Sequence, residues 1–111
     1  MFSVESQGAI DVMTPLAPIS QENVSELLET VEKGLSAGQP MLVLNMNDVP
    51  LVDSAGLEAM LDIQDSLQRR GGTVKWAAVS QLCQEILRIT GVAEHFETYQ
   101  DVKSAVGSYV K

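Results

Sequence analysis

The stretch Leu51-Val52-Asp53-Ser54-Ala55-Gly56-Leu57 decides the fold, because it joins an apolar run to an amphipathic one. Upstream of it, residues Met41 to Met46 are nearly all apolar, as expected of a buried strand. Downstream, apolar side chains recur at helical spacing, at Leu57, Met60, Leu61 and Leu67. The stretch therefore predicts a strand-to-helix turn, with Ser54 near the start of the helix.

Ser54 is a candidate for modification because it lies near the start of the predicted helix. Free backbone N–H groups and the positive end of the helix dipole favour an anion at a helix start, so a phosphate on Ser54 would need little other support. A structural interpretation fits the same residues: Asp53 or Ser54 is the N-cap of the helix. The sequence leaves both interpretations open.

The composition indicates an ordinary globular protein with a strong negative charge. The chain has 111 residues, of which 45% are hydrophobic, and 15 acidic against 7 basic side chains give a formal charge of −8. This length suits a single domain over residues 1–111. The charge repels nucleic-acid phosphates and anionic lipids, so we expect neither as a partner.

Several other classes of protein are excluded by simple patterns. No apolar stretch approaches the roughly 20 residues that span a bilayer, and the N-terminus lacks a signal-peptide pattern, so we expect a cytoplasmic protein without membrane insertion. Cys83 and His95 are the single cysteine and the single histidine. They cannot form an intrachain disulfide or supply the usual zinc ligands, so no metal and no cofactor is expected, and Cys83 is expected in the core.

Three further segments have the patterns of strands. Residues Phe2 to Met13 predict one or two strands, and Pro15 opposes regular ladder hydrogen bonds just beyond them. Residues Thr73 to Ala78, around Trp76, predict an inner strand. A short strand is expected near Ala93 to Phe96.

A helix is predicted on the N-terminal side of the strand Met41 to Met46. Ser20 is a good N-cap, and the apolar face that follows consists of Val24, Leu27, Leu28, Val31 and Leu35. Gly34 or Gly38 should end this helix.

On the C-terminal side, the helix that begins near Ser54 runs to about Arg70. The next helix should begin after Ser80, carry Leu82, Ile86 and Ile89 on one face, and end at Gly91. A closing helix is expected from about Asp101 to Tyr109. Alternating strands and helices imply an α/β fold with right-handed crossovers and a largely parallel or mixed sheet.

Two further features of the sequence are candidates for functional sites. A serine hydrolase requires a glycine two residues before its nucleophile, where this chain has Val52, and the sole candidate base for Ser54 is His95. We therefore do not expect an enzyme. Glu58, Asp62 and Asp65 share one helix face, which indicates a solvated surface or, less often, a surface that faces a basic partner.

The chain resembles the STAS domains, and among them the stand-alone anti-sigma factor antagonists of bacteria. The residues that carry the resemblance are Leu42-Val43-Leu44-Asn45, Val49, Asp53-Ser54-Ala55-Gly56-Leu57, Gly71-Gly72-Thr73-Val74 and Thr90-Gly91-Val92. The resemblance implies a mixed β-sheet of about four or five strands, with about four helices packed mainly on one face. The pattern derived above agrees with that arrangement.

The resemblance also implies a function in transcription regulation. An unphosphorylated antagonist binds an anti-sigma factor that is a serine protein kinase, and phosphorylation of the serine that matches Ser54 releases it. The expected partner-binding residues are Asp53, Ser54, Ala55, Gly56 and Glu58. Gly56 has no Cβ and so lets another backbone approach Ser54. The sequence does not distinguish a monomer from a weak dimer.

One segment departs from the family pattern. Many antagonists have Gly-x-Leu-Asp before the first helix, and this chain has Thr14-Pro15-Leu16-Ala17 there. The family aspartate lies close to the phosphoacceptor, so Ala17 motivates an alternative. In that alternative, the chain is a STAS subunit that never cycles through phosphate, in a signalling scaffold or in a lipid or anion transport machine.

Overall fold

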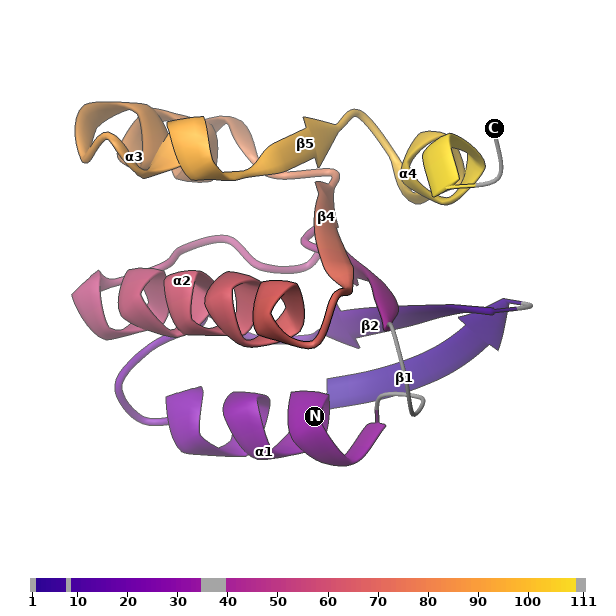
Figure 1. The fold of residues 1–111 in the computed structure, drawn as a ribbon. Coiled ribbons are helices and arrows are strands. Elements are labelled where there is room, and N and C mark those ends of the chain that lie inside the picture. The colour runs from indigo at the N-terminus through magenta and orange to yellow at the C-terminus, as the bar shows by residue number, and fades with distance from the viewer. Residues whose placement is uncertain (1, 8, 35–39, 110–111) are drawn as a thin grey trace.

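The computed structural model describes residues 2–7, 9–34 and 40–109, which form a sheet flanked by helices (Figure 1). The elements in chain order are β1 (Phe2–Gln7), β2 (Ile10–Pro15), α1 (Val24–Gly34), β3 (Met41–Asn45), α2 (Ser54–Arg69), β4 (Thr73–Ala77), α3 (Gln81–Ile89), the 3₁₀ helix η1 (Val92–His95), β5 (Glu97–Tyr99) and α4 (Val102–Tyr109).

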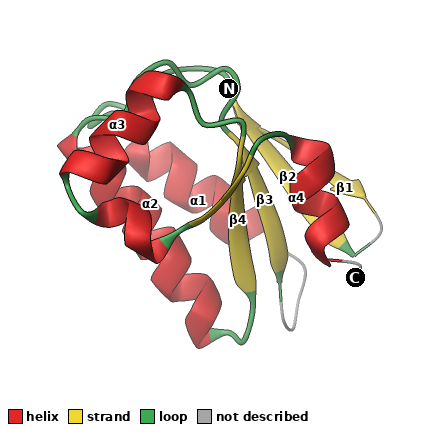
Figure 2. Ribbon diagram, turned by 90° about the horizontal axis from the view of Figure 1, so that it is seen from above, coloured by secondary structure: helices red, strands yellow, loops and turns green. Residues whose placement is uncertain are grey.

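The sheet is mixed, as predicted. Its five strands lie in the order β1-β2-β3-β4-β5, with β1 antiparallel to β2 and every later neighbour parallel. Parallel neighbours need a crossover, and the helices between them provide it. Because β2, β3 and β4 are parallel, their carboxyl ends meet at one edge of the sheet, where green loops lead into the helices in Figure 2.

Helices α1, α2 and α3 cover one face of the sheet, and α4 covers the other (Figures 1 and 2). The larger core lies under the first three helices and includes Trp76, which is fully buried with its ring centroid 4.8 Å from that of Phe96. A smaller core under α4 consists of Ile10, Val12, Val43, Ala77 and Ala105. The expected α/β fold, with helices mainly on one face, is confirmed.

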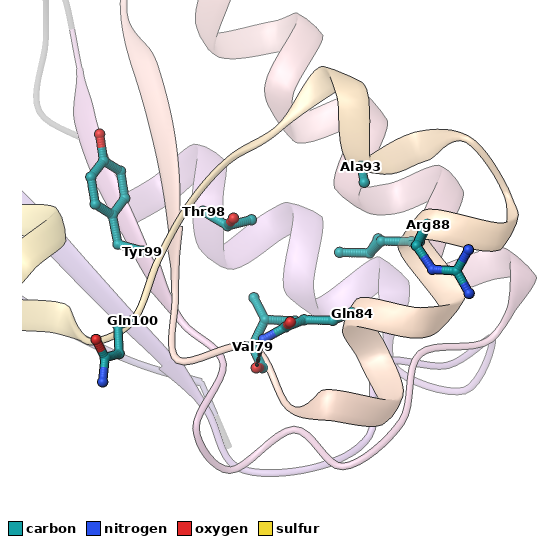
Figure 3. Close-up of a pocket in the computed structure, with 8 residues that line it drawn as sticks. Val79, Gln84, Arg88, Ala93, Thr98, Tyr99 and Gln100 are labelled. Carbon is teal, nitrogen blue, oxygen red and sulfur yellow. Dashed lines mark hydrogen bonds between the residues drawn. The ribbon is translucent and has the colours of Figure 1, made fainter.

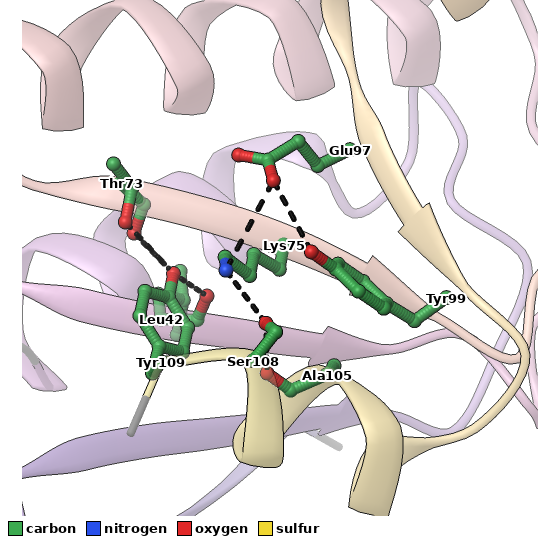
Figure 4. Close-up of polar contacts among 8 residues, drawn as sticks. All are labelled: Leu42, Thr73, Lys75, Glu97, Tyr99, Ala105, Ser108 and Tyr109. Atoms are coloured by element: carbon green, nitrogen blue, oxygen red, sulfur yellow. Dashed lines mark hydrogen bonds and ion pairs between the residues drawn. The ribbon is translucent and has the colours of Figure 1, made fainter. Parts of the chain in front are cut away.

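A polar cluster fixes α4 to the sheet (Figure 4). Lys75 on β4 is 8% exposed, and its ammonium donates to Ser108 Oγ at 2.6 Å and lies 4.2 Å from the centroid of the Tyr109 ring. The same ammonium is 3.9 Å from a carboxylate oxygen of Glu97 on β5. A buried charge requires such partners, so this cluster ties the last helix to two strands.

Strands β3 and β4 and helix α2 begin at the predicted residues and end one residue earlier than predicted. Phe2 to Met13 forms two strands, and β2 continues to Pro15, which the sequence analysis placed outside the ladder. Pro15 is tolerated because the pairing of β2 with β3 already ends at Met13, so the missing N–H removes no bond to that neighbour.

The predicted strand near Ala93 to Phe96 is wrong. Residues 92–95 form η1, in which the Phe96 N–H donates to the Ala93 carbonyl, and the strand follows as Glu97–Tyr99. The left-handed conformation of Gly91, with φ of 78°, turns the chain into η1. Pairing with β4 then begins only where Glu97 comes opposite Lys75.

The apolar face of α3 that the sequence indicated, with Leu82, Ile86 and Ile89, is not the buried face of the helix. Leu82 and Ile89 are 55% and 74% exposed, whereas Cys83 and Leu87 are buried. The predicted N-cap Ser80 is confirmed, since its Oγ accepts from the Cys83 N–H at 3.2 Å. The Cys83 thiol also reaches the Val49 carbonyl at 3.7 Å, which turns the Cys83 side of the helix toward the core.

Helix α1 starts later than Ser20 suggested. The Ser20 carbonyl accepts from the N–H groups of Asn23 and Val24, both at 3.0 Å, so Ser20 begins a turn and the regular helix begins at Val24. Leu27 and Val31 are buried, as predicted for the inner face. Leu35 and Gly38 lie outside the described residues, and α1 ends at the other predicted glycine, Gly34.

Candidate functional site

Ser54 is the first residue of α2 and is exposed at the carboxyl edge of the sheet. The residue before it, Asp53, has extended backbone angles and is the N-cap of the helix. The sequence left Asp53 and Ser54 open as the N-cap, and the structure shows that Asp53 caps the helix. Ser54 lies in the first turn of α2, and its hydroxyl is not the group that caps the helix.

Asp53 joins two loops that are far apart in the sequence. Its Oδ1 accepts from the Gly56 N–H at 2.9 Å, and its Oδ2 accepts from the Gln21 N–H at 3.1 Å. Its own N–H donates to the Ile19 carbonyl at 3.2 Å. The carboxylate therefore satisfies one free donor of α2 and one of the turn before α1, which fixes both helix starts relative to each other.

Gly56 is buried at the contact between the same two segments. A Cβ on Gly56 would lie 2.4 Å from the Ile19 carbonyl oxygen and 2.7 Å from Val52 Cγ1. The sequence indicated that Gly56 lets another backbone come close, and in this structure that backbone is Ile19 of the same chain. Gly56 thus allows the segment before α1 to pack closely against the start of α2.

The other predicted partner-binding residues lie around this contact. Ala55 is half-buried and Glu58 is exposed, both in the first turns of α2. Ala17 lies in the loop after β2 and lines a cavity of about 340 Å³, together with residues from the turn before α1 and from its first half. The structure thus brings Ala17 and Asp53 to the same edge of the sheet.

Sequence reasoning missed two exposed side chains at this edge. Leu16 is 58% exposed in the loop after β2, and Leu51 is 45% exposed in the loop after β3. Leu16 lies between Pro15 and Pro18, and these prolines disfavour a continued strand through that segment. An apolar residue in such a loop is a sequence signal for an exposed apolar side chain. Leu51 was part of the quoted stretch but was considered only as part of a strand-like run.

His95 is not placed to act as a base for Ser54. The side chain of Gln64 donates a hydrogen bond to the His95 carbonyl. Gln64 lies about 15 Å along α2 from Ser54, at roughly 1.5 Å per residue. The two side chains are therefore not arranged as a nucleophile and its base.

The acidic stripe on α2 is exposed at Glu58, Asp62 and Asp65. Asp65 pairs with Arg69 at 3.0 Å, both side chains being largely exposed. Among the described residues, no three acidic, histidine or cysteine side chains are grouped to bind a metal ion. Nor is any helix in the described part of the chain long and apolar enough to cross a membrane.

A separate cavity of about 430 Å³ lies between α3, η1 and β5 (Figure 3). Its lining includes Gln84, Arg88, Thr98 and Tyr99. The Arg88 guanidinium is paired with Glu85 at 2.7 Å, so its charge is already compensated. This cavity shares no residue with the surface around Ser54.

Comparisons with known proteins point to one family. The family model described as the STAS domain matches residues 1–105. A crystal structure from Thermotoga maritima, of a candidate anti-sigma factor antagonist, has a TM-score of 0.92 at 18% identity, and the alignment covers 99% of this chain and 95% of that one. No curated protein sequence matches this chain.

Two further structures are similar over most of this chain. An anti-sigma factor antagonist (STAS) domain protein from Planctomyces limnophilus has a TM-score of 0.87 at 16% identity, covering 99% of this chain and 98% of that one. The murine anion transporter Slc26a9 has a TM-score of 0.81 at 15% identity, covering 92% of this chain and 18% of that one. At such identities a shared structure shows the fold alone, and function has to be argued from the site.

Proposed function

The chain belongs to the STAS domain family, and on that premise we propose that it is an anti-sigma factor antagonist. In its unmodified form it binds an anti-sigma factor that is a serine protein kinase, through Asp53, Ser54, Ala55, Gly56 and Glu58. Phosphorylation of Ser54 releases it. It acts in the cytoplasm of a bacterium, in the regulation of transcription, and it is not an enzyme.

The observation that carries this proposal is the division of roles between Asp53 and Ser54. Asp53 caps α2 with its carboxylate, and Ser54 is exposed beside it. A kinase can therefore reach the hydroxyl without disturbing the cap of the helix. The start of α2 also tolerates the phosphate in the free protein, because helix N-termini favour anions.

The same geometry supports the direction of the switch. A phosphate adds roughly −1.5 to −2 charges at neutral pH, beside a carboxylate whose two oxygens already accept backbone hydrogen bonds. A docked partner would have to strip water from both groups. A penalty of about 3 to 4 kcal/mol would weaken the complex by two to three powers of ten.

The experiment that tests the proposal is intact-mass spectrometry of the protein purified from its own cells, with and without phosphatase. We expect a mass increase of one phosphate that maps to Ser54 and disappears in Ser54→Ala. Ser104→Ala is the matched control, since Ser104 is an exposed serine on α4. A phosphate that maps elsewhere, or none under several growth conditions, contradicts the proposal.

A second candidate is a STAS subunit that never cycles through phosphate, in a signalling scaffold or in a transport machine for lipids or anions. Ala17 favours it, and so does the similarity to a domain of the Slc26a9 anion transporter. In that case the complex isolated from cells is unchanged by phosphatase or kinase treatment. Loss of the partner after kinase treatment removes this candidate.

A further inference from the structure

The exposed large apolar side chains lie mostly at one edge of the molecule. In the described part of the chain they are Leu16, Leu51, Leu82 and Ile89. The first three follow β2, β3 and β4, which are adjacent parallel strands, so all three lie at the carboxyl edge of the sheet that also holds Ser54. We call Leu16, Leu51 and Leu82 the carboxyl-edge leucines.

The segments that carry these leucines, which are two loops and the start of α3, contact one another through hydrogen bonds. The Ile19 N–H, after Leu16, donates to the Leu51 carbonyl at 3.1 Å. The Cys83 thiol, next to Leu82, reaches the Val49 carbonyl in the loop that carries Leu51, at 3.7 Å. The loop after β2, the loop after β3 and the start of α3 are therefore adjacent, and each carries one of the three leucines.

The part of the chain that carries Leu16 and Leu51 is strongly acidic. Residues 1–68 carry 11 acidic side chains and one basic one, Lys33, whereas residues 69–111 carry four acidic and six basic ones. Lys33 lies at the end of α1, where it pairs with Glu29 at 2.7 Å. Three acidic residues in and near the loops, Glu22, Asp48 and Glu58, are exposed, in addition to Asp53. We call these three the acidic rim.

We propose that the carboxyl-edge leucines are the apolar centre of a docking surface, and that its occupant is a protein presenting apolar side chains surrounded by lysine and arginine. The inference rests on the proposed function and deepens it, since this occupant is the kinase partner. Charge complementarity selects it, because an acidic rim attracts cations and speeds association. A second copy of the chain is disfavoured, since a two-fold contact would bring acidic rim against acidic rim.

The apolar centre also explains why a phosphate on Ser54 would release the chain from a partner that is itself cationic. Cations on the partner pair with the rim, where water remains. A phosphate on Ser54 enters at the edge of the apolar contact, where the cost of removing its water exceeds the Coulombic attraction. The rim thus sets the rate of association, and the centre sets the sensitivity to modification.

In the test, tagged full-length protein, as wild type or as a leucine variant, is used to isolate the complex from the native cells. The amount of partner retained by each variant is compared. We expect Leu16→Ser, Leu51→Ser and Leu82→Ser each to reduce the retained partner about tenfold, as for a truncated interface anchor. Ile89→Ser is the matched control, because Ile89 is more exposed than the three leucines but lies at the far end of α3. Equal loss in Ile89→Ser, or no loss in the leucine variants, overturns the inference.

The outcomes separate this inference from the proposed switch. If Ser54→Asp loses the partner and the leucine variants keep it, the phosphate switch stands and the docking surface is wrong. If the leucine variants lose the partner and Ser54→Asp keeps it, the docking surface stands and the switch is wrong.

A second measurement needs no isolated partner. The ¹⁵N-labelled full chain is titrated with a synthetic amphipathic peptide of leucine and lysine, and amide shifts are mapped by NMR. We expect shifts confined to residues 16–23, 46–58 and 80–83, weakened by salt, and absent with the same peptide carrying glutamate in place of lysine. Shifts elsewhere, or equal shifts with both peptides, overturn the inference.

Discussion

At the scale of single residues, Gly56 and Asp53 hold the start of α2 against the segment that follows β2. Gly56 does so by the absence of a Cβ, which leaves room for the Ile19 carbonyl. Asp53 does so by accepting from both Gly56 and Gln21. The place of Ser54 therefore depends on contacts between residues more than 30 positions apart.

Gly56→Ala should destabilise the protein by about 2–3 kcal/mol, the cost of forcing extra atoms into a packed site. The added Cβ would meet backbone at 2.4 Å, and the backbone cannot move aside as a flexible side chain can. Urea unfolding followed by the fluorescence of Trp76 measures the change. In the control Gly107→Ala, nothing lies within 4 Å of the new Cβ. Helix propensity should raise the stability there by about 0.5 kcal/mol, and equal stability of Gly56→Ala and wild type would contradict the assigned contact.

At the scale of elements, α3 shows that a helix with apolar residues on two sides can face either way. Leu82, Ile86 and Ile89 form one stripe, and Cys83 and Leu87 form another. The second faces the core because the Cys83 thiol and the Leu87 side chain meet buried partners there. The first stripe is left at the surface, where Leu82 is available to a partner.

Leu87→Ala should lower the free energy of unfolding by about 2–4 kcal/mol, since it removes a buried side chain and leaves a cavity. Leu82→Ala should change it by less than about 0.5 kcal/mol, as expected for an exposed site. The pair of variants, compared by urea unfolding, tests the orientation of α3 directly. A larger loss for Leu82→Ala than for Leu87→Ala would mean that the helix faces the other way.

Polar contacts fix both ends of the closing helix α4. The Tyr109 hydroxyl lies 3.0 Å from the Leu42 carbonyl and 2.9 Å from the Thr73 carbonyl, and it accepts from Thr73 Oγ1 at 3.0 Å. At the other end of the helix, the Asp101 carboxylate accepts from the Ser104 N–H at 2.7 Å. That backbone hydrogen bond is the main reason why the pKa of Asp101 lies below its usual value. The two ends of α4 are thus fixed by groups that titrate on opposite sides of neutral pH.

Tyr109 should make stability fall in alkaline solution. Burial raises the pKa of Tyr109 above its ordinary value of 10.0, so in that range the unfolded chain releases its proton first. The stabilisation is complete below about pH 10 and is lost as the pH rises through the folded-state pKa. Urea unfolding from about pH 8 to 11 should show this decline in wild type and a smaller one in Tyr109→Phe.

At neutral pH, Tyr109→Phe should cost about 1 kcal/mol for its lost hydrogen bonds. Tyr99→Phe serves as the control, because the Tyr99 hydroxyl donates to the exposed Glu97 carboxylate at 3.2 Å. It should keep the alkaline decline of the wild type. An unchanged decline in Tyr109→Phe would show that another group causes it.

At the scale of the whole molecule, charge is distributed unevenly along the chain. The segment before Arg69 has one basic residue, and nine of its eleven acidic side chains lie on α1, on α2 and in the loops at the carboxyl edge. Self-repulsion of this kind destabilises the compact state and attracts partners of opposite charge. One charge distribution therefore bears on both stability and recognition.

Added salt should stabilise the protein at neutral pH. Raising NaCl from about 0.01 to 0.3 M shortens the Debye length from roughly 30 Å to below 10 Å, which screens the repulsion. Asp62→Asn removes a like charge four residues from Glu58 and should raise stability at low salt by about 0.2–0.5 kcal/mol. Glu85→Gln is the control, since it breaks the pair with Arg88 and should not stabilise. Lower stability in salt, measured by urea unfolding, would contradict the assigned repulsion.

Much of the fold could be predicted because its signals are local. The apolar run of β3, the periodicity of α2 and the cap of α3 at Ser80 each lie within a short window, and each was located within a residue or two. Strand β5 has only three residues, of which Glu97 and Thr98 are exposed, so it has no apolar pattern to detect. It is a strand because β4 offers it an edge to pair with.

The sequence by itself determined the order of the main helices and strands, the family resemblance and the position of Ser54 at a helix start, because each depends on neighbouring residues. The tertiary structure decided which stripe of α3 is buried, which residue caps α2, and that Leu16, Leu51 and Leu82 share one edge with Ser54. Those outcomes depend on contacts such as Asp53 with Gln21 and Gly56 with Ile19. Such contacts join residues that only the parallel order of β2 and β3 brings together, because periodicity records the faces of an element but not the partners that cover them.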